Sequence, residues 1–168
     1  EKLKLQALNS MCSILEKVLP ERQSYSEIFN ASNAFINLLT LQDQRKNDHW
    51  IEGYVKWEIG VLSSIGFSLD LKRCAVTGAK TNLYFVSPKT GKAVSKEGAG
   101  KHAPKLLLLP FFLGGEKVIG SNFYKEILAG LNITSYFFKN KLLLSINTNK
   151  AINLPKPRIR FVELIEKL

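Results

Sequence analysis

One stretch constrains the fold of this chain more than any other: residues 50–66, WIEGYVKWEIGVLSSIG. When these residues are placed at about 100° each around a helix axis, the small and polar ones share one narrow arc and apolar side chains occupy the rest. A helix with so wide an apolar face must be packed against on two sides. The pattern therefore predicts the central helix of a helical domain.

Glu58 interrupts the apolar face of this helix, because it projects between Ile51, Tyr54, Leu62 and Ile65. A carboxylate in that position needs a partner, since burying an unpaired charge is costly. We expect a structural glutamate held by an arginine or by backbone N–H groups. The alternative is a catalytic acid, because perturbed buried acids occur in active sites as well as in structural networks.

Residues 74–95 indicate a β-hairpin that begins near Cys74. Residues 83–87 favour a strand, Pro88 and Gly91 are typical of a turn, and residues 92–95 form the returning strand. This hairpin is expected as a small insertion in the helical domain. We treat Cys74 as a structural residue of the hairpin.

Apolar spacing predicts further helices over residues 1–19, from the capping box at residues 24–27 to near residue 45, from Ser121 and after Pro155. In the first of these helices the spacing predicts a buried stripe that includes Cys12. Residues 103–109 are predicted to form a short buried helix. The predicted fold class is mainly α: one compact helical domain over residues 1–168 with a small β-hairpin insertion, of a length that suits a single core. The predicted stripe of the first helix consists of Leu5, Leu8, Cys12, Leu15 and Leu19.

The chain is strongly basic, with 24 Lys and Arg against 14 Asp and Glu and a net charge of +10. A partner that is a nucleic acid, an acidic peptide or a membrane surface would complement this charge, although a basic soluble protein without such a partner is the simpler alternative. The candidate phosphate contacts are Lys101 and Lys105 in a glycine-rich segment, and Arg158 and Arg160 in the last helix. The segment could equally be a solvated turn, and the two arginines could instead pair with Glu58 or another acid.

Several classes of function lack their sequence signals. The segment around Lys101 fails as a nucleotide-binding loop, because Ser95 stands where glycine is needed and His102 where Ser or Thr is needed. No nucleophile–base spacing and no metal box is visible, so we expect no enzyme and no cofactor; a hydrolase that uses Cys74 or Glu58 is the weaker alternative. The longest apolar run, residues 106–113, is too short to cross a bilayer, and two distant cysteines suit a reducing cytoplasm.

Four motifs in a fixed order resemble the RecO family of bacterial recombination mediators. They are aromatic-Glu-Ile at residues 57–59, Leu-x-x-Ile-Gly-aromatic at 62–67, Leu-Asp-Leu-x-x-Cys at 69–74 and Ser-Pro-x-x-Gly at 87–91. Residues 19–22, 130–137 and the Leu-Pro-x-Pro-Arg segment from Leu154 are also similar to this family. The resemblance thus covers nearly the whole chain and points to the helical C-terminal portion of such proteins.

The resemblance implies a non-enzymatic role in bacterial DNA repair, in a nucleoid-associated cytoplasmic protein. RecO proteins bind single- and double-stranded DNA, promote strand annealing, dock on the acidic tail of single-stranded-DNA-binding protein, and load RecA together with RecR. Their N-terminal OB-fold domain has no counterpart here, so we expect a fragment. The tail-docking bases of relatives match residues 54–57, where Lys56 retains a positive charge and Val55 does not. A basic helical nucleic-acid-binding module of another family is the competing interpretation.

One departure from the family concerns zinc. Many RecO proteins hold zinc with two Cys-x-x-Cys pairs, whereas here Cys74 is followed by Thr77 and residues 93–96 contain no cysteine. A structural zinc ion requires four tetrahedral ligands, and one cysteine does not supply them. We therefore expect a chain without metal, whose hairpin is held by packing of Leu83, Phe85 and Val94.

Overall fold

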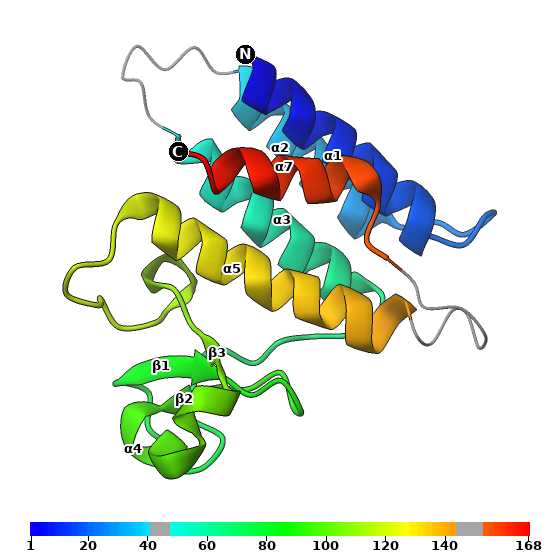
Figure 1. The fold of residues 1–168 in the computed structure, drawn as a ribbon. Coiled ribbons are helices and arrows are strands. Elements are labelled where there is room, and N and C mark those ends of the chain that lie inside the picture. The colour runs from blue at the N-terminus through cyan, green and yellow to red at the C-terminus, as the bar shows by residue number, and fades with distance from the viewer. Residues whose placement is uncertain (41–47, 144–152) are drawn as a thin grey trace.

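The computed structural model describes residues 1–40, 48–143 and 153–168, with the backbone alone for residues 141–143. The protein is mainly helical and carries a small antiparallel sheet, which confirms the predicted fold class (Figure 1). Among the described helices, none combines the length and the hydropathy that a membrane span requires. The elements in chain order are α1 (Lys2–Val18), α2 (Ser26–Thr40), α3 (Trp50–Ser64), β1 (Leu83–Val86), β2 (Ala93–Ser95), α4 (Lys96–Ala99), the 3₁₀ helix η1 (Gly100–Lys105), β3 (Leu107–Leu108), the 3₁₀ helix η2 (Phe111–Leu113), α5 (Phe123–Phe137), the π-helical turn η3 (Phe138–Leu143) and α7 (Lys156–Ile165).

Helix α3 is the centre of the helical part, as its wide apolar face predicts. It packs against α2 on one side and α5 on another, while α7 packs against α1 and α5. Trp57 stacks on Phe35 of α2, whereas Tyr54 meets Phe35 and also Phe161 of α7 edge to face. Eight residues of α3 are buried: Trp50, Ile51, Tyr54, Val55, Trp57, Glu58, Val61 and Leu62.

The buried face of α1 differs from the predicted one. Leu5 and Cys12 are exposed, whereas the buried residues are Ala7, Ser10, Met11, Ile14 and Val18. Helix α1 carries two apolar stripes at helical spacing, and periodicity alone does not choose between them. The stripe that turns inward is the one that brings Ser10 to the Tyr54 hydroxyl of α3. The burial predicted for Cys12 was therefore wrong.

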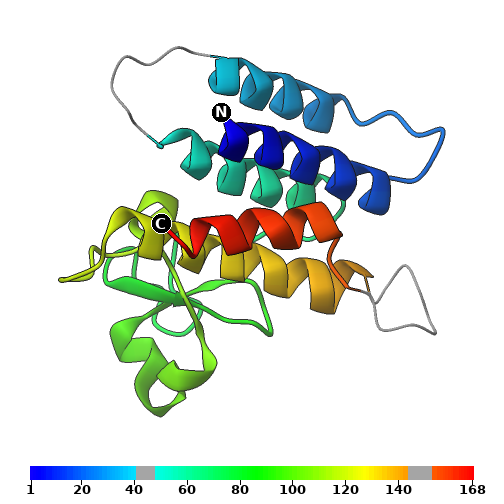
Figure 2. The same ribbon diagram turned by 45° about the horizontal axis from the view of Figure 1, so that its top comes forward.

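Residues 70–108 form a compact unit, here called the β module, which contains β1, β2, α4, η1 and β3. In both ribbon views it lies beyond α5, on the side of the molecule away from α2 (Figures 1 and 2). The predicted hairpin is confirmed, because β1 pairs antiparallel with β2 in the register Val86↔Ala93. Its turn closes with the Gly91 amide on the Ser87 carbonyl at 2.8 Å, and Gly91 has a φ of 70°.

A third strand was not predicted. Strand β3 pairs with the other edge of β1, in the register Phe85↔Leu108, and gives the strand order β2-β1-β3. The sequence interpretation of residues 103–109 as a buried helix was wrong. A short apolar run suits a strand as well as a helix, and the open edge of β1 decided between them, since its amides and carbonyls need partners.

Candidate functional site

The predicted burial of Glu58 and its pairing with an arginine are confirmed. Its side chain is 0% exposed, and Arg158 of α7 holds it through two hydrogen bonds, from Nε to Oε1 at 3.0 Å and from Nη2 to Oε2 at 3.1 Å. The Tyr54 hydroxyl donates to Oε1 at 3.0 Å, and the Thr134 hydroxyl of α5 donates to Oε2. Ser10 of α1 shares a 2.6 Å hydrogen bond with the Tyr54 hydroxyl. Four helices meet at this network.

The side chains of this network are buried, so none of them faces solvent where a substrate could bind. Arg158 also donates to the Leu131 carbonyl, and among the described residues no buried side-chain nitrogen or oxygen lacks a hydrogen-bond partner. Burial, and after it the carboxylate of Glu58, raise the pKa of Tyr54 well above its usual value. Burial alone would lower the pKa of Arg158, but its attraction to Glu58 outweighs burial and raises that pKa. A buried, bidentate pair of this kind is a structural element.

Arg158 was predicted as a DNA contact, and the structure corrects this. Its side chain is 2% exposed and its guanidinium is committed to Glu58, so it cannot reach a phosphate. The alternative prediction, that Arg158 pairs with Glu58, is confirmed. Its neighbour Arg160 is exposed on the opposite side of α7, beside Cys12 and Lys156.

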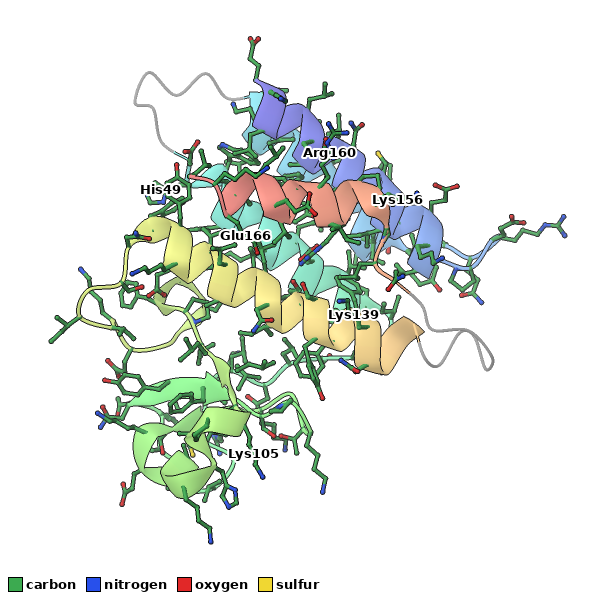
Figure 3. All side chains as sticks on the ribbon, in the orientation of Figure 1. His49, Lys105, Lys139, Lys156, Arg160 and Glu166 are labelled. Carbon is green, nitrogen blue, oxygen red and sulfur yellow. The ribbon has the colours of Figure 1, made fainter. Side chains whose placement is uncertain are left out.

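Lys101 and Lys105 are exposed on η1, within the β module. The segment predicted as a glycine-rich loop is instead the one-turn helix α4 followed by η1, and Ser95 caps α4 by accepting the Gly98 amide at 3.0 Å. Figure 3 labels Lys105 in the β module and Arg160 on α7, on opposite sides of the molecule. The structure therefore brings Lys101 and Lys105 together and leaves Arg160 apart.

The β module concentrates the positive charge of the chain, which sequence reasoning missed. Its 39 residues contain eight lysines and arginines and two acids, a net charge of +6, whereas the whole chain carries +10. All eight are exposed, and none forms a salt bridge within the described residues. A count of charge along residues 70–108 would have found this signal. The eight are Lys72, Arg73, Lys80, Lys89, Lys92, Lys96, Lys101 and Lys105.

Lys56 lies on the exposed arc of α3, as predicted, with its Nζ 5.9 Å from the centroid of the Phe112 ring. Phe112 also lines a cavity of about 300 Å³ at the start of α5. Phe111 and Phe123 contribute to its wall, and Lys117 is exposed at its edge. This arrangement, here called the aromatic pocket, combines apolar surface with two nearby ammonium groups.

Cys74 is buried at 2% exposure, and its sulfur accepts hydrogen bonds from two segments of the β module. Ser95 donates through its amide at 3.2 Å and its hydroxyl at 3.3 Å, and the amides of Val76 and Thr77 donate at 3.4 Å. Burial favours the neutral thiol, but the hydrogen bonds from Ser95 and Thr77 outweigh it and lower the pKa of Cys74 to about 6. Within the described residues there is no group of three or more His, Cys, Asp or Glu side chains that could hold a metal ion.

Comparison with known proteins assigns the chain to a family. Residues 3–150 match the family model described as "Recombination protein O C terminal". The chain belongs to the RecO C-terminal family. It is 38% identical over 167 residues to the DNA repair protein RecO of Cereibacter sphaeroides and 41% identical over 150 residues to that of Wolbachia pipientis.

These alignments cover most of this chain but less of each RecO relative. They include 99% and 88% of this chain, respectively, and 65% and 60% of the two relatives. The chain thus spans less than two thirds of the length of these RecO proteins. No solved structure matched the chain.

Proposed function

We propose that this chain is the helical C-terminal portion of a non-enzymatic recombination mediator that acts in bacterial DNA repair. We further propose that this mediator is a cytoplasmic, nucleoid-associated protein. The observation that carries the proposal is the family match over residues 3–150, together with RecO relatives that are named DNA repair proteins. The hydrolase alternative loses support, because Glu58 is fully engaged by Arg158 and Thr134, and Cys74 is buried among hydrogen-bond donors.

DNA binding through the β module is the next step of the proposal. Eight exposed cations on 39 residues could neutralise phosphates, and this contribution to binding would not depend on base sequence. Lys101 and Lys105 are the first candidates because they lie together on one short helix, η1. Arg160 would contribute only if DNA also reached α7.

The test is a DNA-binding titration with matched charge reversals. Lys101→Glu/Lys105→Glu should weaken binding of labelled single- and double-stranded oligonucleotides at least tenfold. Lys2→Glu/Lys17→Glu changes two exposed lysines of α1 and alters the net charge equally, so it serves as the control. If the two pairs weaken binding to the same extent, the β module is not the DNA surface. If wild-type protein binds neither oligonucleotide, the proposed DNA binding fails for this portion of the protein.

A second contact is proposed between the aromatic pocket and the acidic tail of single-stranded-DNA-binding protein, which ends in an apolar residue. The wall of Phe111, Phe112 and Phe123 would take the apolar terminus, while Lys56 and Lys117 would face the carboxylates. Two acids at the pocket already take part in hydrogen bonds: Glu52 with the His49 ring at 3.2 Å, and Glu126 with the Phe111 amide, which donates to it. The proposal also includes cooperation with RecR in loading RecA.

Titration with a tail peptide tests this contact. Lys56→Glu should lower the affinity for the peptide severalfold, and Phe112→Ala should do the same by removing apolar wall. Lys139→Glu, on an exposed lysine beyond the end of α5, is the charge control. An affinity that Lys56→Glu leaves unchanged would remove Lys56 from the site.

A further inference from the structure

Two short turns of the β module face one another with identical spacing. Cys74 and Thr77 stand at the first and fourth positions of one turn, and Ser95 and Gly98 at the first and fourth positions of the other. The Thr77 and Ser95 hydroxyl oxygens are 3.4 Å apart, and the Ser95 hydroxyl lies 3.3 Å from the Cys74 sulfur. A Cβ placed on Gly98 would lie 3.0 Å from that sulfur. All four positions therefore converge on one point.

This is the arrangement of a four-ligand zinc site, in which two pairs spaced by two residues approach the ion from two turns. The residues present do not fit zinc, because they supply one thiol, two hydroxyls and no fourth side chain. The distances do not fit either. Tetrahedral sulfur ligands at about 2.3 Å from zinc lie about 3.8 Å from one another, whereas the contacts here are at hydrogen-bond length.

The hydrogen bonds of the sulfur connect the same two turns that a metal ion would connect. Val76 and Thr77 donate their amides from the first turn, and Ser95 donates its amide and its hydroxyl from the second. Ser95 also accepts the Gly98 amide, so the fourth position is joined through the backbone. Glycine at position 98 matters, because any side chain there would press on Cys74 and Val76.

We propose that Cys74, Thr77, Ser95 and Gly98 occupy the four ligand positions of a tetrahedral zinc site, and that in this chain hydrogen bonds to the Cys74 sulfur join the two turns in place of a metal ion. The β module folds around this cluster without metal. The cluster fixes the start of α4, and thereby the orientation of the basic segment that follows it.

Metal content is the first test. The purified chain should carry no stoichiometric zinc by elemental analysis, and neither a chelator nor added zinc should shift its melting temperature. One zinc per chain, or a melting temperature that falls with the chelator, would overturn the proposal.

Restoring the ligands is the sharper test. Thr77→Cys/Ser95→Cys/Gly98→Cys should bind one Co²⁺ per chain with the absorption of tetrahedral thiolate coordination, and Zn²⁺ should displace it. The same triple substitution with Cys74→Ala is the matched control, and it should lose the four-thiolate spectrum. If the triple variant is unfolded without metal, it should fold when Co²⁺ or Zn²⁺ is added. A triple variant that takes up no metal in either state shows that the four positions are not corners of one site.

Discussion

At the scale of single residues, the buried pair of Glu58 and Arg158 dominates the helical core. Both side chains are almost fully enclosed, and the pair joins α3 to α7 across 100 residues of sequence. Removal of one partner from a buried ion pair leaves an uncompensated charge, whereas removal of both can be nearly neutral. The other members have further partners, since Tyr54 retains Ser10 and Thr134 can donate to the Leu131 carbonyl.

This asymmetry makes a prediction about stability. Glu58→Ala and Arg158→Met should each lower the free energy of unfolding by about 3–5 kcal/mol, while Glu58→Met/Arg158→Met should cost less than either single change. Glu163→Ala, on an exposed residue of α7, is the control and should fall within about 0.5 kcal/mol of wild type. Urea denaturation measures all four. Additive costs in the double variant would show that the two side chains are not coupled.

The lowered pKa of Cys74 predicts how stability depends on pH. A thiol with a pKa of about 6 in the folded protein and 9.0 when unperturbed contributes stability that is complete above pH 9. That contribution is lost as the pH falls towards 6, because the unfolded chain then binds the proton more readily than the folded one.

The stability difference between wild type and Cys74→Ala should therefore be larger at pH 9 than at pH 6. Denaturant unfolding at a series of pH values measures it, and Cys12→Ala, on the exposed cysteine, should follow the wild-type curve. A difference that does not change with pH would place the thiol pKa at its ordinary value.

At the scale of elements, two glycines show where helices pack closely and where they do not. A Cβ on Gly130 of α5 would lie 2.9 Å from both Phe112 and Val55, so the absence of a side chain there lets α5 approach α3. A Cβ on Gly60 of α3 would meet nothing within 4 Å. The two helical glycines thus occupy opposite environments.

Alanine substitution should separate these two positions. Gly130→Ala should destabilise the protein by about 1–3 kcal/mol through overpacking, whereas Gly60→Ala should stabilise it by about 0.5–1 kcal/mol because alanine is the better helix former. Thermal unfolding of the two variants checks the signs. A gain in stability from Gly130→Ala would mean that the α3–α5 contact can widen at little cost.

At the scale of the whole molecule, the positive charge and the buried core lie mostly in different parts of the protein. The helices hold the buried ion pair and most of the core, while the β module carries +6 of the net +10 on a small sheet beyond α5 (Figure 1). Because phosphate binding releases counterions, the salt dependence of DNA affinity counts the cations that touch DNA.

Reversal of four module cations should therefore change the salt slope. We expect Lys92→Glu/Lys96→Glu/Lys101→Glu/Lys105→Glu to flatten the plot of log affinity against log salt by roughly 0.7–0.9 for each phosphate that the variant no longer neutralises. Lys2→Glu/Lys17→Glu/Lys139→Glu/Lys167→Glu alters the net charge equally on exposed lysines outside the β module and should retain most of the slope. Equal slopes for the two variants would assign DNA binding to net charge alone.

The sequence by itself determined the elements whose signals are local. The apolar arc of residues 50–66 predicted the central helix and the burial of Glu58, and the Pro-x-x-Gly turn predicted the hairpin, because periodicity and turn chemistry act within a few residues. The tertiary structure decided what depends on partners distant in the chain. It paired Arg158 with Glu58 rather than with DNA, and it turned Ala7 rather than Cys12 inward. It also paired residues 107–108 with β1 and brought Thr77 and Ser95 to the sulfur of Cys74. In each case the local pattern allowed two outcomes, and contacts with residues distant in the chain selected one of them, by burying a charge or an apolar face or by pairing a strand edge.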